Sequence, residues 1–193
     1  MAFKTIVVND SGIHVAYTDT GAPSQSPYVT IVAIHGMCFS ARSFHLSLSS
    51  TIFLTQLPTA TFKRVQDAAI KKGVRFVALN RRNYPGTTPY SEADNSALVN
   101  GTKEQKDAWH RDRGHEVGMF IHKFINKENL PPISADRKTG GIILLGWSAG
   151  ACEANATIAH ANTLPSDVRS HLALYVRSLI VQGVFCLYSV QHA

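Results

Sequence analysis

The pentapeptide Gly146-Trp147-Ser148-Ala149-Gly150 follows the apolar run Gly141-Ile142-Ile143-Leu144-Leu145 and precedes the small-residue stretch Ala151-Cys152-Glu153-Ala154-Asn155-Ala156. This order predicts a buried strand, a sharp turn and a helix, which is the context in which Gly-x-Ser-x-Gly presents a nucleophilic serine. Such a turn brings the strand end against the helix start, so Gly146 and Gly150 remove side chains that would clash. We therefore expect Ser148 to lie in a strained backbone conformation above the sheet.

A serine hydroxyl is a weak nucleophile, and it needs a neighbouring base and donors aimed at the oxyanion that it creates. The amide of Ala149 is expected to point out of the helix N-terminus, where the helix dipole favours negative charge. The alternative interpretation is a glycine-flanked turn whose serine only caps the helix.

The composition predicts one globular domain over residues 1–193, because 45% of the residues are apolar and 17% are charged. No membrane segment is expected, since the most apolar stretch, Leu172 to Val190, contains Arg177 and Gln182. The first ten residues lack the layout of a signal peptide. The three cysteines, Cys38, Cys152 and Cys186, are odd in number and widely spaced, which favours reduced thiols and a cytoplasmic location.

The net charge of +6 comes from scattered basic residues with acids interleaved among them. A nucleic-acid interface would gather the bases with aromatics on one face, so no nucleic-acid partner is expected. No pair of histidines has metal-site spacing such as His-Glu-x-x-His, so the sequence predicts no metal. Hydrolysis through a nucleophilic serine needs no cofactor, and none is expected.

Alternating strand and helix patterns predict a mostly parallel sheet covered on both faces, opened by a hairpin. Expected strands cover Lys4–Val8, Ile13–Thr18, Tyr28–Ile34, Val74–Leu79, a segment from Ile142, and Ser178–Val184. The first two expected helices are one that buries Phe62, Val65 and Ala69 and one from a Thr102/Gln105 capping box to Pro131-Pro132. Two more are expected: one from the turn at Gly146–Gly150, here called the elbow, to about His160, and one capped by Ser166 or Asp167. His35, Asn80 and Trp147 fall at strand carboxyl ends, where such sheets bind ligands.

Three segments in this order resemble the α/β-hydrolase family, specifically the AB hydrolase-1 group and its fungal members: Val32-Ala33-Ile34-His35-Gly36-Met37, Asn80-Arg81-Arg82-Asn83-Tyr84-Pro85-Gly86 and Leu144-Leu145-Gly146-Trp147-Ser148-Ala149-Gly150. The resemblance covers most of residues 1–182 and implies the α/β-hydrolase fold with Ser148 as the nucleophile. It further implies an oxyanion hole from the amides of Met37 and Ala149, with His35 supporting its loop. The implied substrate pocket is flanked by Gly36, Asn80, Tyr84 and Trp147.

Two departures from the family pattern stand out. Ser43 to Phe62 is a charge-free segment that reads as an insertion, interpreted as a lid, a disordered loop or a retained intron. The tail Gly183–Ala193 no longer resembles the family, whose acid and histidine follow later strands. The resemblance therefore implies a domain truncated after about the sixth strand, with an exposed apolar last strand that invites self-association.

Other residues of the sequence could act as the base. Asp167 and His171 could pair on one helical face, with a surface ion pair as the alternative, and His192 lies in the tail. The predicted function is hydrolysis of a small ester or amide through an acyl-enzyme at Ser148, impaired in this chain because the family's acid and histidine are missing. Whether the chain is an enzyme stays open; the alternatives are an inactive binding protein of the same fold or a gene-model fragment.

Overall fold

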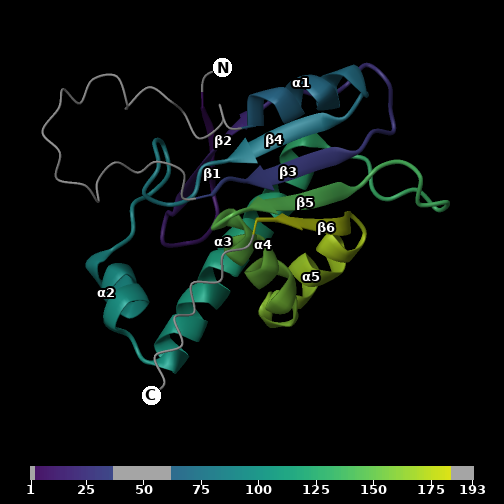
Figure 1. Cartoon of the computed structure of the whole chain (residues 1–193). Helices are drawn as coiled ribbons and strands as arrows, with labels where there is room; N and C mark the ends of the chain where they lie inside the picture. The colour runs from purple at the N-terminus through teal and green to yellow at the C-terminus, as the bar shows by residue number, and fades with distance from the viewer. Residues whose placement is uncertain (1–2, 37–61, 184–193) are drawn as a thin grey trace, which may run out of the picture.

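The computed structural model describes residues 3–36 and 62–183 (Figure 1). One six-stranded sheet has the order β1-β2-β4-β3-β5-β6. The strands are β1 (Lys4–Val7), β2 (His14–Asp19), β3 (Thr30–Ile34), β4 (Arg75–Leu79), β5 (Ile142–Trp147) and β6 (Val176–Gln182). The β1–β2 hairpin is antiparallel and pairs antiparallel with β4, whereas β4, β3, β5 and β6 run parallel to one another. The predicted mostly parallel sheet opened by a hairpin is therefore confirmed.

Helices cover both faces of the sheet (Figure 1). They are α1 (Lys63–Lys71), α2 (Glu92–Asn100), α3 (Lys103–Glu128), α4 (Gly150–Ala159) and α5 (Ser166–Ala173), with a short 3₁₀ turn at Ala161–Thr163. On one face α1 packs over a small core that includes Phe62, Phe76 and Ala78. On the other face α3, α4 and α5 enclose the larger core, in which Phe120 and Phe124 of α3 are fully buried.

The parallel strands end in register. Ile34 lies opposite Leu79 on one side and Gly146 on the other, and Trp147 lies opposite Gln182. The residues that follow these strands therefore emerge along one edge of the sheet. This confirms that the segments beginning at His35, Asn80 and Trp147 converge on a single rim.

Several boundaries and burials differ from the sequence-based expectation. The capping box of Thr102 and Gln105 is present, but α3 ends at Glu128 because Asn129 adopts a left-handed φ of 49°, before the two prolines. Val65 of α1 is 43% exposed, and Gln66 is buried in its place. The expectation that Ser166 or Asp167 caps α5 was wrong.

Ser166 and Asp167 both lie inside α5, and the N-cap position is taken by Pro165, which offers no side-chain cap. Strand β6 begins at Val176, two residues before the expected Ser178, and ends at Gln182 and not at Val184. Helix α2 was not predicted at all. It buries none of its residues and is started by a capping box between Ser91 and Asp94, so it carries no apolar periodicity that could reveal it.

The suggested insertion at 43–62 and the divergent tail at 183–193 lie mostly outside the described residues. Phe62 belongs to the folded part, since its ring packs 5.6 Å from Phe76 and 6.4 Å from Trp147 between ring centroids. Within residues 3–36 and 62–183, no helix combines the length and apolar character needed to cross a membrane.

Strand β6 lies at one edge of the sheet and pairs only with β5 in the described chain. Two of its apolar side chains are exposed, Leu179 by 36% and Ile180 by 43%. A strand edge with unpaired backbone groups and apolar side chains is a template for pairing with another chain.

We expect the chain to self-associate through β6, and Ile180→Lys to shift it toward the monomer, because a lysine on a strand edge opposes intermolecular pairing. Light scattering at increasing protein concentration measures the mass. Ile70→Lys is the control, since Ile70 is also exposed but lies on α1, away from the edge. A monodisperse monomer for all three proteins at every concentration would contradict the expectation.

Candidate active site at the strand-to-helix elbow

Ser148 lies in the turn between β5 and α4, half-buried, with a backbone φ of 54°. This is the left-handed region, which costs a non-glycine residue roughly 1–2 kcal/mol. Two backbone bonds hold the turn: the Ser148 amide donates to the Gln182 carbonyl at 2.8 Å, and the Ser148 carbonyl accepts from the Ala151 amide at 2.9 Å. The predicted strained backbone at this position is confirmed.

The glycines of the motif are required by close packing. A Cβ at Gly146 would lie 2.6 Å from the Cα of Ala151, and one at Gly150 would overlap the carbonyl oxygen of Ile34. Gly36 is constrained by the serine itself, since a Cβ there would come within 2.7 Å of the Ser148 Cβ and 3.1 Å of its Oγ. The end of β3, the end of β5 and the start of α4 are therefore in direct backbone contact around the hydroxyl.

His35 is buried immediately behind Gly36. Its Nε2 accepts the Arg81 main-chain N–H at 3.2 Å, so Nδ1 carries the proton and donates to the Gly36 carbonyl at 2.7 Å. The pKa of His35 is lowered to about 4, mainly by burial; the Gly36 bond raises it and the positive charge of Arg81 lowers it, and both effects are smaller. His35 is thus a neutral imidazole with a hydrogen bond at each ring nitrogen.

The other expected pocket residues divide into two kinds. Asn80 is 1% exposed, and its Nδ2 donates to the Pro85 carbonyl at 2.9 Å, so it shapes its own loop. Tyr84 and Trp147 are half-buried. The Tyr84 ring lies edge-on to His35 at 4.3 Å between centroids, so it flanks the segment that precedes the elbow.

Of the two expected oxyanion donors, Met37 lies outside the described residues. Ala149 is the N-cap residue of α4. An amide at this position has no acceptor within its own helix, so it is available to an anion.

No histidine or carboxylate of the described chain hydrogen-bonds to the Ser148 hydroxyl. Among the described residues Asp167 and His171 form no ion pair, which was the alternative to a functional pairing. The Nδ1 of His171 instead lies 2.9 Å from the Nδ1 of His122 on α3. The residues that the structure describes also contain no cluster of three His, Cys, Asp or Glu side chains that could hold a metal ion.

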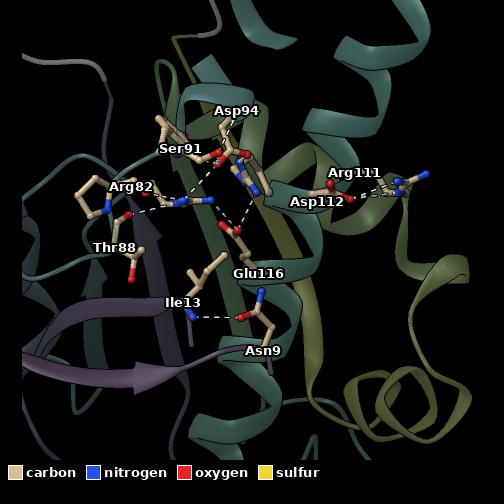
Figure 2. Close-up of polar contacts among 12 residues, drawn as sticks. Asn9, Ile13, Arg82, Thr88, Ser91, Asp94, Arg111, Asp112 and Glu116 are labelled. Carbon is tan, nitrogen blue, oxygen red and sulfur yellow. Dashed lines mark hydrogen bonds and ion pairs between the residues drawn. The ribbon is translucent and has the colours of Figure 1, made fainter. Parts of the chain in front are cut away.

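Sequence reasoning missed a set of buried ion pairs beside the elbow. Arg81 Nε donates to Glu153 Oε1 at 2.7 Å, which ties the loop after β4 to the first turn of α4. One residue on, Arg82 pairs with Glu116 of α3 at 3.3 Å and with Asp94 of α2 at 3.3 Å, as Figure 2 shows. A signal was present, because a glutamate in the small-residue helix after the elbow needs a buried partner.

Arg113 completes this cluster, with its guanidinium 2.8 Å from Glu116 and 3.1 Å from Asp94. Burial raises the pKa of Glu116 to about 7, although Arg113 and Arg82 oppose the shift. The cluster fixes the loop that starts at Asn80 onto helices α2 and α3. It has no contact with Ser148 among the described residues, so its role at the site is structural support.

Two cavities adjoin the cluster. One, of about 20 Å³, lies between the loop after β4 and helices α3 and α4 and is bordered by Asn80, Arg81 and Glu153. The other is an open groove of about 610 Å³ between the β1–β2 turn and α3, bordered by Asn9, Ile13 and Glu116 (Figure 2). Neither includes Ser148, so the larger volume of the groove does not make it the candidate site.

Comparison with solved structures places this geometry in a known architecture. An esterase (EaEST) from Exiguobacterium antarcticum matches with a TM-score of 0.50 at 14% identity, over 95% of this chain and 45% of the esterase. The chain has the α/β-hydrolase fold. VrEH2 matches with a TM-score of 0.50 at 13% identity, over 93% of this chain and 37% of that one. Epoxide hydrolase VrEH1 from Vigna radiata gives 0.49 at 12% identity, over 93% and 39%.

The chain spans less than half the length of the solved α/β-hydrolase structures that it matches here. No family model matches the sequence, and no curated protein matches it significantly. At these identities the likeness concerns the fold, and the chemistry has to be argued from the residues of the elbow.

We expect Ser148→Gly to be more stable than Ser148→Ala by about 1 kcal/mol, because glycine adopts a φ of 54° without a steric penalty and alanine does not. Both variants lack the hydroxyl, so their difference isolates the backbone strain. Chemical denaturation gives the two free energies of unfolding. Equal values would mean that the left-handed turn stores no strain.

We also expect His35 to make the fold less stable as the pH falls from 6.5 to 4, because burial lowers its pKa from 6.5 to about 4 and the unfolded chain binds the extra proton in this window. The loss is at most about 3 kcal/mol. His35→Gln, which can keep an acceptor for the Arg81 amide, should flatten this part of the stability curve. Denaturation at a series of pH values measures it, with the exposed His14→Gln as control. Parallel curves for wild type and His35→Gln would contradict the assignment.

Proposed function

We propose that this chain carries the nucleophile of a serine hydrolase that acts on a small ester or amide. The observation that supports this most is the left-handed backbone of Ser148 at the junction of β5 and α4, enclosed by three glycines that no larger residue could replace. Strained backbone of this kind concentrates at functional sites. In the α/β-hydrolase fold, a serine on such a turn is the attacking group.

In the proposed reaction, the Ser148 Oγ forms a bond to the acyl carbon while its proton passes to a base. The negative charge that develops on the carbonyl oxygen is stabilised by the Ala149 amide and the N-terminus of α4. The leaving group then departs with a proton, and water releases the acyl group from Ser148. No cofactor is part of this scheme, and a cytoplasmic location without nucleic-acid partners remains part of the proposal.

The scheme needs a base, and no described histidine or carboxylate is bonded to the Ser148 hydroxyl. His35 is the histidine next to the elbow, but both of its nitrogens are engaged and burial lowers its pKa to about 4. Without a base, a serine enzyme retains only about 10³- to 10⁴-fold acceleration over water. We therefore propose low activity for these residues alone.

The same observation favours a second candidate, a non-enzymatic binding protein of this fold. A rim with a preserved elbow and, among residues 3–36 and 62–183, no base bonded to the serine could still hold a small acyl compound. Ligand binding that survives Ser148→Ala would support this candidate, because binding does not need the hydroxyl as a nucleophile.

We expect a fluorophosphonate to label the folded chain at Ser148, because the hydroxyl is presented beside the Ala149 amide. Labelling should be slow, because no base among the described residues is bonded to the hydroxyl to activate it. Mass spectrometry locates the adduct. Ser148→Ala should abolish labelling, whereas Ser170→Ala should not, since Ser170 is an exposed serine within α5. If folded wild-type protein carries no adduct at Ser148, the proposal fails.

A further inference from the structure

A buried ion pair lies directly behind the elbow. Arg81 comes two residues after β4 ends, and Glu153 lies in the first turn of α4, with Nε and Oε1 2.7 Å apart. Their side chains are only 10% and 8% exposed. Neither charge could stay buried alone at tolerable cost, so the two side chains act as a unit that joins the β4 loop to α4.

A line of hydrogen bonds continues from this pair to the serine. The main-chain N–H of Arg81 donates to His35 Nε2, and the His35 Nδ1–H donates to the Gly36 carbonyl. Gly36 in turn has its Cα packed against the Ser148 side chain, with no room for a Cβ. The hydrogen bonds in this line are 2.7 to 3.2 Å long and buried or partly buried, so a displacement of Arg81 reaches Gly36 through direct contacts.

Helix α4 connects the ion pair to the serine by a second route. It begins immediately after Ser148, and a Cβ at Gly150 would lie 2.6 Å from the His35 carbonyl oxygen. The helix that carries Glu153 is therefore the one that holds the nucleophile turn. We propose that Glu153 is a positioning residue, which through Arg81 and His35 sets the place of Gly36 against Ser148. The consequence for reactivity rests on the proposed function, whereas the geometric part does not.

The negative charge of Glu153 is what makes its bond to Arg81 strong. Glutamine could still accept a bond from Arg81, but a bond between two charged groups is roughly twice as strong as a neutral one. Arg81→Met retains the main-chain N–H that reaches His35 and removes only the guanidinium. Both single variants therefore loosen the loop without deleting any group that contacts Ser148.

The experiment measures two properties of the folded chain: the rate at which a fluorophosphonate modifies Ser148, and the ¹⁵N resonances of the His35 imidazole. We expect Glu153→Gln and Arg81→Met each to slow modification about 10-fold and to shift the His35 resonances, because the Arg81 amide no longer holds Nε2 firmly. Asp112→Asn is the control, since it removes a carboxylate from the exposed pair of Arg111 and Asp112. It should change neither property.

A double variant, Arg81→Met with Glu153→Leu, separates positioning from stability. Replacing a buried ion pair by apolar side chains of similar volume is often neutral or stabilising, so this variant is expected to fold even if a single variant does not. It should remain slow toward the reagent. Recovery of the wild-type rate together with the stability would overturn the proposal, as would unchanged rates and His35 resonances in all three variants.

Failure of the proposed function gives a different pattern. In that case wild-type protein carries no adduct at Ser148, and the His35 resonances alone decide the inference. A shift in Glu153→Gln and Arg81→Met but not in Asp112→Asn supports the link from Glu153 to His35. An unchanged imidazole in both overturns it.

Discussion

The left-handed backbone of Ser148 is the constraint on which the rest of the rim depends. It persists because the surrounding packing leaves no alternative: β5 is paired on both sides, by β3 and β6, and the Ser148 amide is bonded to Gln182 at the end of β6. On the other side of the turn, α4 begins at a glycine pressed against the end of β3. The strain is therefore held by three strands and a helix together, and the serine is presented by the fold as a whole.

Buried arginines at both ends of β4 perform a related task. At its start, Arg75 lies between Asp19 of β2 and Glu128 of α3, at 2.6 and 2.7 Å, so it fixes the hairpin and the long helix to the strand. After its end, Arg81 and Arg82 bind α4 and α3. The loop that follows β4 has no regular secondary structure of its own, and side-chain ion pairs supply the order that backbone ladders supply elsewhere.

Periodicity and the elbow motif were enough to predict the sheet, the rim and the strained serine, because each follows from local pattern: apolar runs for β3 and β5, a capping box for α3, glycines flanking Ser148. Helix α2 could not be found this way, since it buries nothing. The partners of Arg81 and Arg82 were also out of reach, because Glu153 and Glu116 meet them only through the packing of α4 and α3 on the sheet. Local sequence predicts elements well and pairings between distant charges poorly.

A glycine at position 148 would fit the turn without strain. Serine adds a methylene and a hydroxyl there, and among the described residues this hydroxyl has no hydrogen-bond partner that would stabilise the fold. The rim around it is nevertheless held by hydrogen bonds, since an imidazole bonded at both nitrogens and a buried ion pair reach it through Gly36. A costly backbone conformation that brings no structural gain is explained if the hydroxyl acts on something outside the chain, which is the argument for reading this elbow as a site of chemistry.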